Sequence, residues 1–397
     1  MRYRFGNCEI RIDTHELLVD GRAAAIEPQV FELIRFLAEN AERLVTHEEL
    51  IDAVWGGRIV SDSAVSARIS AARAALGDSG SRQDIIRTVP RRGFRFLPRV
   101  EPQDAAPQPP VAETQPRQSI RFCRSSDGHE IAYAATGSGR PLVRAGHWLT
   151  HLEHDWRSPV WRPFLDEMGR SFSLVRYDQR GNGLSDWKLK SFSLESCVAD
   201  LEAVADAAGL DRFTLFGTSQ GAPIAVAYAA RHPERVERLI LLGGYARGRL
   251  ARESLAEREE GEAIITLIRH GWGKPGSQFI RAFSSMFIPD ATPEQISSLT
   301  ELQRLTTSAE NAVTIRTAVD RFDVSGLLER VVTPTLVMHA RNDSIQPLAQ
   351  GRELALGIRG AEFVMFEGDN HVILPHEPAW KEFFEAIRRF ALEGTVS

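Results

Sequence analysis

Apolar and polar residues alternate with two different periods in the first hundred positions of the chain. Residues 1–20 alternate in short steps of two, which predicts a small antiparallel sheet. Apolar residues then recur every three or four positions in segments that open at Pro28, Thr46 and Asp62, which predicts three helices. Two further apolar stretches flank a basic turn at residues 90–93. They predict a hairpin that completes a small α+β domain.

From Ser119 onward, short apolar stretches alternate with longer helical segments. The stretches expected to be strands are residues 120–123, 131–134, 141–143, 172–177, 213–216, 238–242, 335–339 and 362–366. Strand and helix alternation favours a mostly parallel, doubly wound sheet covered on both faces. Residues from about 245 to 325 hold helical patterns without a strand, and we interpret them as a helical lid.

Two pairs of polar residues have the spacing of a helix capping box. Thr46 precedes Glu49, and Thr292 precedes Gln295, each by three positions. In such a box each side chain bonds the backbone N–H of the other residue, which fixes the first turn of a helix. We therefore expect helices to begin directly after Thr46 and Thr292.

A proline-rich stretch separates the two patterns. Residues 101–118 contain five prolines and no Ile, Leu or Phe, so this stretch cannot bury a core and should act as a semi-rigid spacer. We therefore predict a domain at residues 1–100, a linker at residues 101–118 and a second domain at residues 119–397.

Composition limits the class of protein. The chain of 397 residues is 43% hydrophobic and 25% charged, which is typical of soluble globular proteins. No apolar run reaches the roughly 18 residues of a membrane span, and no signal-peptide core follows Met1, so we expect a cytoplasmic protein without a membrane partner. Three widely spaced cysteines fit neither a disulfide framework nor a zinc site.

The net charge of −5 hides a basic region. From Arg58 to Arg99, nine arginines outnumber three aspartates, a local balance of +6. Such an excess is the electrostatic footprint of a protein that contacts the phosphates of DNA. A solvated charged surface is the alternative interpretation.

A sheet, three helices and a basic hairpin, in this order, are the parts of a winged helix-turn-helix. The sequence resembles the OmpR/PhoB type of DNA-binding domain through Leu37 and residues 45–50, 54–55, 65–78 and 88–96. The resemblance implies that the third helix enters the major groove of double-stranded promoter DNA and that the hairpin reaches the minor groove. The residues implied to lie at the DNA are Ser66, Arg68, Ser70, Arg73, Arg91 and Arg92.

The pentapeptide at residues 217–221 has the pattern G-x-S-x-G between an apolar strand-like stretch and an alanine-rich helical stretch. A serine displayed at a sharp strand-to-helix turn needs neighbours without side chains two positions away on either side, because its backbone is strained. The pattern predicts that Ser219 is a nucleophile.

The chain resembles the α/β-hydrolase fold throughout residues 119–397. The matching motifs occur in the expected order at residues 177–186, 217–221, 341–343 and 368–371. The resemblance implies that Ser219 attacks a carbonyl carbon, that His371 takes and returns its proton, and that Asp343 orients the imidazole. The alternative acids are Asp323 and Asp369.

The backbone N–H of Gln220 is one expected oxyanion donor, because it lies at the start of the helix after the serine. Members of the family usually carry His-Gly after the third core strand, whereas this chain has Ala-Gly followed by His147 and Trp148. We expect the second donor to be the backbone N–H of one of these two residues. His147, His151 and His154 together are an alternative metal site, which we set aside in favour of a pocket opening, so we expect no metal and no cofactor.

These patterns predict a transcriptional regulator with an N-terminal winged helix that binds promoter DNA. Its C-terminal hydrolase domain would sense, and also hydrolyse, a small ester, lactone or thioester. Two alternatives stay open: a ligand receptor without catalysis, and an ester hydrolase merely tethered to DNA. A homodimer is compatible with each of the three.

Overall fold

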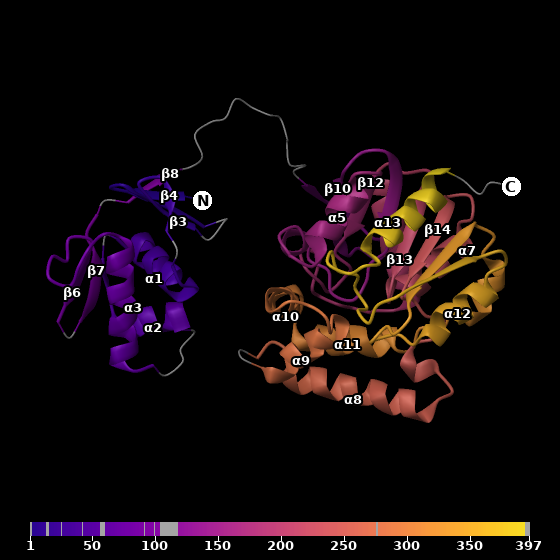
Figure 1. Cartoon of the computed structure of the whole chain (residues 1–397). Coiled ribbons are helices and arrows are strands. Elements are labelled where there is room, and N and C mark those ends of the chain that lie inside the picture. The colour runs from indigo at the N-terminus through magenta and orange to yellow at the C-terminus, as the bar shows by residue number, and fades with distance from the viewer. Residues whose placement is uncertain are drawn as a thin grey trace. The chain divides into compact units, whose positions relative to one another are not determined.

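The chain forms two units, Met1–Thr114 and Gln115–Ser397, which Figure 1 draws in indigo-to-purple and in magenta-to-yellow. The computed structural model describes residues 2–12, 16–24, 26–41, 43–55, 60–90, 92–98, 100–103, 118–274 and 277–393. Each unit has hydrophobic clusters of its own.

The described residues of the first unit form two sheets and three helices. One sheet has the order β4-β3-β2-β1-β8, and the other has the order β5-β7-β6. The strands are β1 (Arg2–Phe5), β2 (Cys8–Arg11), β3 (Glu16–Val19), β4 (Arg22–Ala23), β5 (Leu44–Val45), β6 (Ile86–Val89), β7 (Gly93–Phe96) and β8 (Glu101–Gln103). The helices are α1 (Pro28–Glu39), α2 (His47–Trp55) and α3 (Asp62–Ala75). Their apolar faces meet in one core that includes Leu33, Leu37, Leu50, Val65 and Phe96.

Local capping explains where these helices begin. Pro28 is the first residue of α1, a position that needs no backbone N–H donor. Thr46 and Glu49 form the expected capping box at α2, with backbone-to-side-chain distances of 2.8 and 3.2 Å. The Ser61 hydroxyl accepts the backbone N–H of Ala64 at 3.3 Å and so caps α3.

The five-stranded sheet of the first unit includes residues that the sequence assigns to the linker. Glu101–Gln103 pair antiparallel with Arg2–Arg4 as strand β8 at the edge of the sheet. Pro102 fits there because an edge strand has one side without a hydrogen-bonded neighbour. The predicted linker is therefore shorter at its start than composition suggests.

The second unit is built on an eight-stranded sheet with the order β16-β15-β14-β13-β11-β12-β10-β9. Strands β11 to β16 pair in parallel, whereas β10 pairs antiparallel with both β9 and β12. The strands are β9 (Ser119–Arg124), β10 (Glu130–Thr136), β11 (Arg140–Arg144), β12 (Phe172–Tyr177), β13 (Phe213–Thr218), β14 (Val236–Leu242), β15 (Thr335–Ala340) and β16 (Glu362–Phe366).

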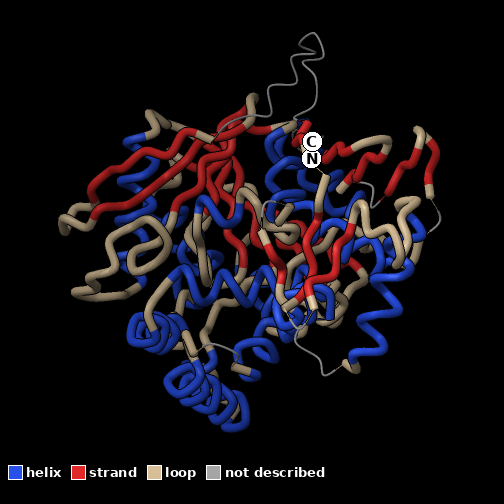
Figure 2. Tube along the Cα trace, turned by 90° about the vertical axis from the view of Figure 1, so that its left-hand side faces the viewer, coloured by secondary structure: helices blue, strands red, loops and turns tan. Residues whose placement is uncertain are grey.

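Helices cover both faces of this sheet, as Figures 1 and 2 show. Residues from α6, α7 and α12 join one apolar cluster, and residues from α5 and α13 join the other. The bounds are α4 (Leu152–Asp155), α5 (Trp161–Gly169), α6 (Leu194–Ala207), α7 (Gly221–Arg231), α12 (Leu348–Gly357) and α13 (Trp380–Arg388), with short helical turns at Arg249–Ala251, Ser325–Arg330 and Arg389–Glu393. In the described residues, every helix is too short or too polar to cross a membrane.

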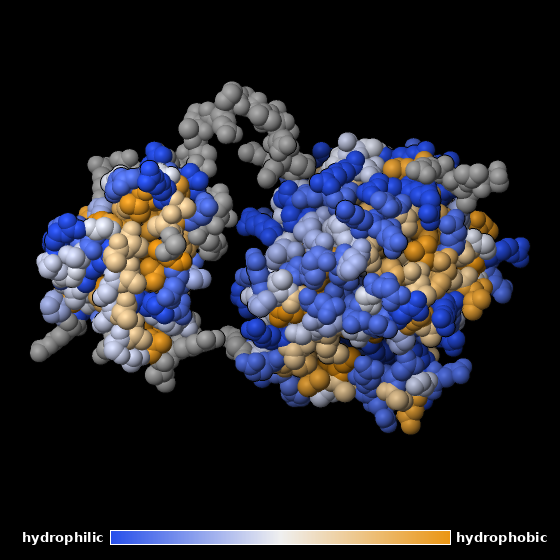
Figure 3. All heavy atoms as spheres, viewed as in Figure 1, coloured by the Kyte–Doolittle hydropathy of each residue, from blue (hydrophilic) through white to orange (hydrophobic). Residues whose placement is uncertain are grey.

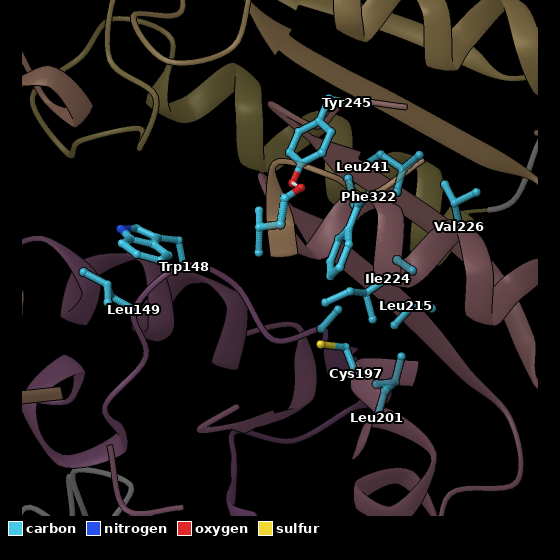
Figure 4. Close-up of a cluster of buried hydrophobic side chains, with 14 of the residues drawn as sticks. Trp148, Leu149, Cys197, Leu201, Leu215, Ile224, Val226, Leu241, Tyr245 and Phe322 are labelled. Carbon is cyan, nitrogen blue, oxygen red and sulfur yellow. Dashed lines mark hydrogen bonds between the residues drawn. The ribbon is translucent and has the colours of Figure 1, made fainter. Parts of the chain in front are cut away.

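Successive side chains of the central strands enter opposite clusters, as the pleat requires. Leu215 of β13 belongs to the cluster under α6 and α7, and its neighbour Phe216 belongs to the cluster under α5 and α13. Figure 4 shows Leu215 beside Ile224 of α7 in the first cluster. Both faces are buried, so most residues of these strands are apolar.

Between β14 and β15, the residues that the structure describes form four α-helices, in the region that the sequence predicts as helical. They are α8 (Leu255–Gly271), α9 (Gln278–Phe287), α10 (Pro293–Thr306) and α11 (Ala309–Val319). The expected capping box of Thr292 and Gln295 is present at the start of α10. In Figure 3 polar residues cover most of this face of the second unit, and apolar positions form separate patches.

Candidate active site and nucleic-acid interface

The outward face of α3 in the first unit carries small residues. Ser66 and Ser70 are exposed one turn apart, so both hydroxyls are accessible to a ligand on this face. Arg92, in the turn between β6 and β7, is exposed as well. Arg91 lies outside the described residues.

Two other residues predicted to contact DNA bond residues of their own unit instead. The resemblance implies that Arg73 lies at the DNA, but the residue is buried, and its guanidinium donates to the carbonyl of Ile86 at 2.7 Å and to the Thr88 hydroxyl at 2.8 Å. Helical spacing cannot reveal that a long side chain reaches a strand beside its helix. Arg68 is half-buried and pairs with Glu27 at 2.9 Å.

The hairpin adds two arginines that the sequence analysis missed. Arg87 of β6 and Arg95 of β7 are exposed and face each other directly across the strand pair. Like charges in this position destabilise a hairpin unless an anion neutralises them. The alternation of β7, with Phe94 and Phe96 buried, could have placed Arg95 on the outer face before the structure was known.

The elbow at Ser219 has the backbone that a displayed serine requires. Ser219 has φ of 52°, in the left-handed region that disfavours side chains. A Cβ at Gly217 would lie 2.6 Å from the carbonyl oxygen of Gly221 and 2.8 Å from Cβ of Ala225. The turn is therefore too tight for any residue but glycine at this position.

The end of β14 joins the elbow to the other two residues of the predicted triad. The backbone N–H of Ser219 donates to the carbonyl of Leu242 at 2.9 Å. A Cβ at the next residue, Gly243, would lie 3.1 Å from Oδ2 of Asp343 and 3.2 Å from Cε1 of His371. Residues from three distant parts of the chain thus meet at one edge of the sheet.

Asp343 and His371 are directly hydrogen bonded. Nδ1 of the imidazole lies 2.9 and 2.8 Å from the two carboxylate oxygens. Oδ1 of Asp343 also accepts the backbone N–H groups of Ile345 and Gln346. Burial raises the pKa of Asp343, but the charge and hydrogen bond of His371 outweigh it, so the pKa is lowered overall. The carboxylate is therefore ionised at neutral pH.

The other ring nitrogen of His371 is available for chemistry. Within the described chain, Nε2 of His371 is buried without a hydrogen-bond partner, so the Ser219 hydroxyl is not bonded to it in this structure. The alternative acids bond other residues: Asp369 accepts the Asn342 amide at 2.9 Å, and Asp323 accepts the Ser325 hydroxyl at 2.6 Å.

The loop after β11 packs against the start of α7, where the oxyanion donors are expected. A Cβ at Gly221 would lie 3.1 Å from the carbonyl oxygen of Gly146. The Gly146 N–H is already used, because it donates to the Tyr177 hydroxyl at 2.8 Å. Among the described residues no backbone acceptor is recorded for the N–H groups of Gln220, His147 or Trp148.

The side chains of these residues hold the loop in place. The Gln220 amide donates to Oε1 of Gln179 at 2.6 Å, and the Trp148 ring meets the Trp272 ring edge-on at 5.8 Å. Burial, followed by the charge of Arg144, puts the pKa of His147 well below its usual value, so this imidazole is neutral.

Comparison with known proteins identifies the families that the two units resemble. Residues 152–378, more than half of the chain, match the family model described as alpha/beta hydrolase fold. The chain belongs to the α/β-hydrolase fold family. Residues 21–96 match the model described as transcriptional regulatory protein, C terminal, so the hydrolase domain is fused to a regulator-type DNA-binding domain.

Individual relatives are distant but cover the hydrolase domain well. A pyrrolizixenacetamide deacetylase of Xenorhabdus hominickii is 25% identical over 67% of this chain and 96% of its own length. The crystal structure of the esterase RhEst1 from Rhodococcus sp. ECU1013 aligns with a TM-score of 0.56 at 24% identity, covering 69% of this chain and 98% of that one. An enol-lactonase of Burkholderia xenovorans LB400 aligns with a TM-score of 0.53 at 22% identity, covering 67% and 98%.

The helical region of the hydrolase domain is bonded to both loops that carry the acid and the histidine. At the end of α9, the carbonyl of Phe287 accepts the backbone N–H of His371 at 2.9 Å, and the carbonyl of Met286 accepts the Ser344 hydroxyl at 2.6 Å. Sequence patterns do not reveal these contacts, because backbone carbonyls make them.

The predicted pocket opening around His151 and His154 is a separate hollow of about 590 Å³, lined also by Glu153, Glu294 and Glu301. His371 and Ser219 do not line it. The described part of the chain holds no cluster of three or more His, Cys, Asp or Glu residues arranged for a metal.

The motif at residues 177–186 contains buried charged side chains that hydrogen bond to the loops near the site. Arg180 is completely buried and bonds Asp200 at 2.6 Å and Asp127 at 2.6 Å. Asp178 is also buried and accepts the backbone N–H groups of Leu152 and Leu184. These bonds fix the loops that surround the elbow.

Proposed function

We propose that this protein is a transcriptional regulator whose hydrolase domain binds and hydrolyses a small ester, lactone or thioester. The observation that supports catalysis most strongly is the Asp343–His371 pair, with the second imidazole nitrogen unpartnered beside the strained Ser219 elbow. A domain that only bound a ligand would not need this strain or this orientation.

In the proposed reaction, Nε2 of His371 accepts the proton of the Ser219 hydroxyl as its oxygen attacks the carbonyl carbon. The tetrahedral oxyanion is stabilised by the N–H of Gln220 and by the N–H of His147 or Trp148. His371 then protonates the leaving group, and the same base activates a water molecule that hydrolyses the acyl-enzyme. The Asp343 carboxylate stabilises the imidazolium in both steps.

The contacts between α9 and the triad loops suggest how a ligand could affect regulation. The carbonyls of Phe287 and Met286 accept hydrogen bonds from the loops that carry His371 and Asp343. A group bound at Ser219 would therefore shift the helical region through these loops. We propose that this change alters dimerisation or domain docking, and thereby binding to paired half-sites on DNA.

A fluorophosphonate probe tests the catalytic part. The wild type should form one covalent adduct by intact-protein mass spectrometry, because the activated hydroxyl attacks phosphorus. The Ser219→Ala variant should form none, and Ser285→Ala, which removes a hydroxyl from α9 outside the triad, should react as the wild type does. A folded wild type that forms no adduct would favour the receptor without catalysis.

A further inference from the structure

Arg144 is a buried cation without a protein partner. It ends β11, is 4% exposed, and has a side-chain Nε without a hydrogen-bond acceptor. No hydrogen bond or ion pair of its guanidinium is recorded with any residue that the structure describes. Buried guanidinium groups are normally paired, because removing the charge from water is costly.

The surroundings hold Arg144 in place without neutralising it. Its guanidinium carbon lies 4.4 Å from the centre of the Trp161 ring and 5.2 Å from that of Phe164. The acid with the largest electrostatic effect on Arg144 is Asp155, but the Asp155 carboxylate pairs with Arg176 at 3.6 Å. Burial lowers the pKa of Arg144 to about 9, so the group is still charged at neutral pH.

Arg144 lines a small cavity that adjoins the triad. His371 lines the same cavity, as does Thr218, which directly precedes the nucleophile. The other lining residues are Trp161, Phe164, Phe216, Leu242, Val372 and Ile373. The cavity has a volume of about 10 Å³, which is room for roughly one water-sized group. Most of the other lining side chains are apolar, and Arg144 is the only arginine or lysine that lines the cavity.

We propose that Arg144 is a specificity-determining residue that pairs with a carboxylate on the substrate, so that the hydrolase domain prefers esters or lactones that carry an acid group. This inference rests on the proposed hydrolysis. A carboxylate matches the guanidinium fork, and one of its oxygens is the size of the group that the cavity admits. A phosphoryl group is larger and suits the cavity less well.

The experiment compares matched pairs of substrates that differ by one carboxylate. The first pair is mono-4-nitrophenyl glutarate and 4-nitrophenyl valerate, with the charge on the acyl side. The second pair is 3-acetoxybenzoate and phenyl acetate, with the charge on the leaving group. For each pair the readout is the ratio of kcat/KM for the charged and the neutral ester.

We expect the wild type to favour the charged ester of at least one pair, and Arg144→Met to lower that ratio by at least about tenfold. Arg144→Lys should restore part of the ratio because it keeps the charge. Arg162→Met is the matched control: Arg162 stacks on Trp156 at 4.2 Å but already bonds Asp166, and it does not line the cavity. Its ratio should equal that of the wild type.

A binding measurement separates this inference from the proposed reaction. Acetate should raise the melting temperature of the Ser219→Ala variant more than the isosteric amide acetamide does at equal ionic strength, and Arg144→Met in that background should abolish the difference. Equal ratios in wild type and Arg144→Met, or equal effects of acetate and acetamide, would overturn the inference. Hydrolysis of neutral esters that Ser219→Ala abolishes would leave the proposed function intact in that case. If Arg144→Met does not fold, the Arg144→Lys ratios and the acetate comparison decide.

Discussion

Asp178 illustrates how a single buried group shapes the hydrolase domain. Its carboxyl is completely buried and is held by the backbone N–H groups of Leu152 and Leu184 at 3.2 and 2.8 Å. Burial raises its pKa from 3.8 to about 7. A proton on Asp178 therefore binds the folded state more tightly than the unfolded state, which makes folding depend on pH.

We predict that Asp178→Asn makes the stability of the hydrolase domain less sensitive to pH. Because the folded pKa is raised, the stabilisation by Asp178 is complete below about pH 4 and is lost as pH rises toward 7, by up to about 1.4 kcal/mol per pH unit. The amide carries no such proton. Urea unfolding at several values between pH 4 and pH 8 should show the variant gaining on the wild type as pH rises, whereas parallel curves would exclude this role.

The residue scale also shows where sequence reasoning was limited. The G-x-S-x-G pattern located the strained elbow, because glycine spacing records a local backbone requirement. The lack of a protein partner for Arg144 and the burial of Arg73 could not be predicted, because each depends on which distant elements pack beside the side chain. Long cationic side chains look alike in a sequence whether they reach solvent or a carbonyl group.

At the scale of elements, the hairpin of β6 and β7 is the feature that best fits an anionic partner. Arg87 and Arg95 oppose each other on its exposed face, and Arg92 is exposed in its turn. Two like charges at one register position have a cost in the free protein that the phosphates of DNA would remove.

We predict that Arg87→Ala combined with Arg95→Ala weakens binding to double-stranded DNA and lowers the slope of log K against log salt by about 2, since each phosphate contact contributes about 0.9. Fluorescence anisotropy across a salt series measures this slope. Arg35→Ala is the control, because Glu32 and Glu39 already neutralise Arg35 on α1. A slope equal to that of the wild type would remove the hairpin from the interface.

Element boundaries followed the sequence wherever a local signal specified them. The capping boxes at Thr46 and Thr292 begin α2 and α10 as expected, because both partners lie within one turn. Strand β8 was missed, since its pairing with β1 joins residues almost a hundred positions apart in a proline-containing stretch. The bonds from α9 to the triad loops were missed because backbone carbonyls of a distant segment accept them.

At the scale of the whole molecule, two units with separate buried clusters lie in one polypeptide. The first unit has the architecture and family match of a regulator DNA-binding domain, and the second belongs to the α/β hydrolases. Because each cluster of buried apolar residues lies within one unit, each unit has its own source of stability. We therefore propose that the two units influence each other through the ligand that binds and reacts at Ser219.

Genome-wide mapping of bound DNA sites, paired with transcript levels, tests this link most directly when the wild type is compared with Ser219→Ala in the native host. We predict that both proteins occupy a shared set of promoter sites and that transcription of the adjacent genes differs between them. Absence of enriched sites for either protein, or identical transcript levels at every shared site, would contradict the account.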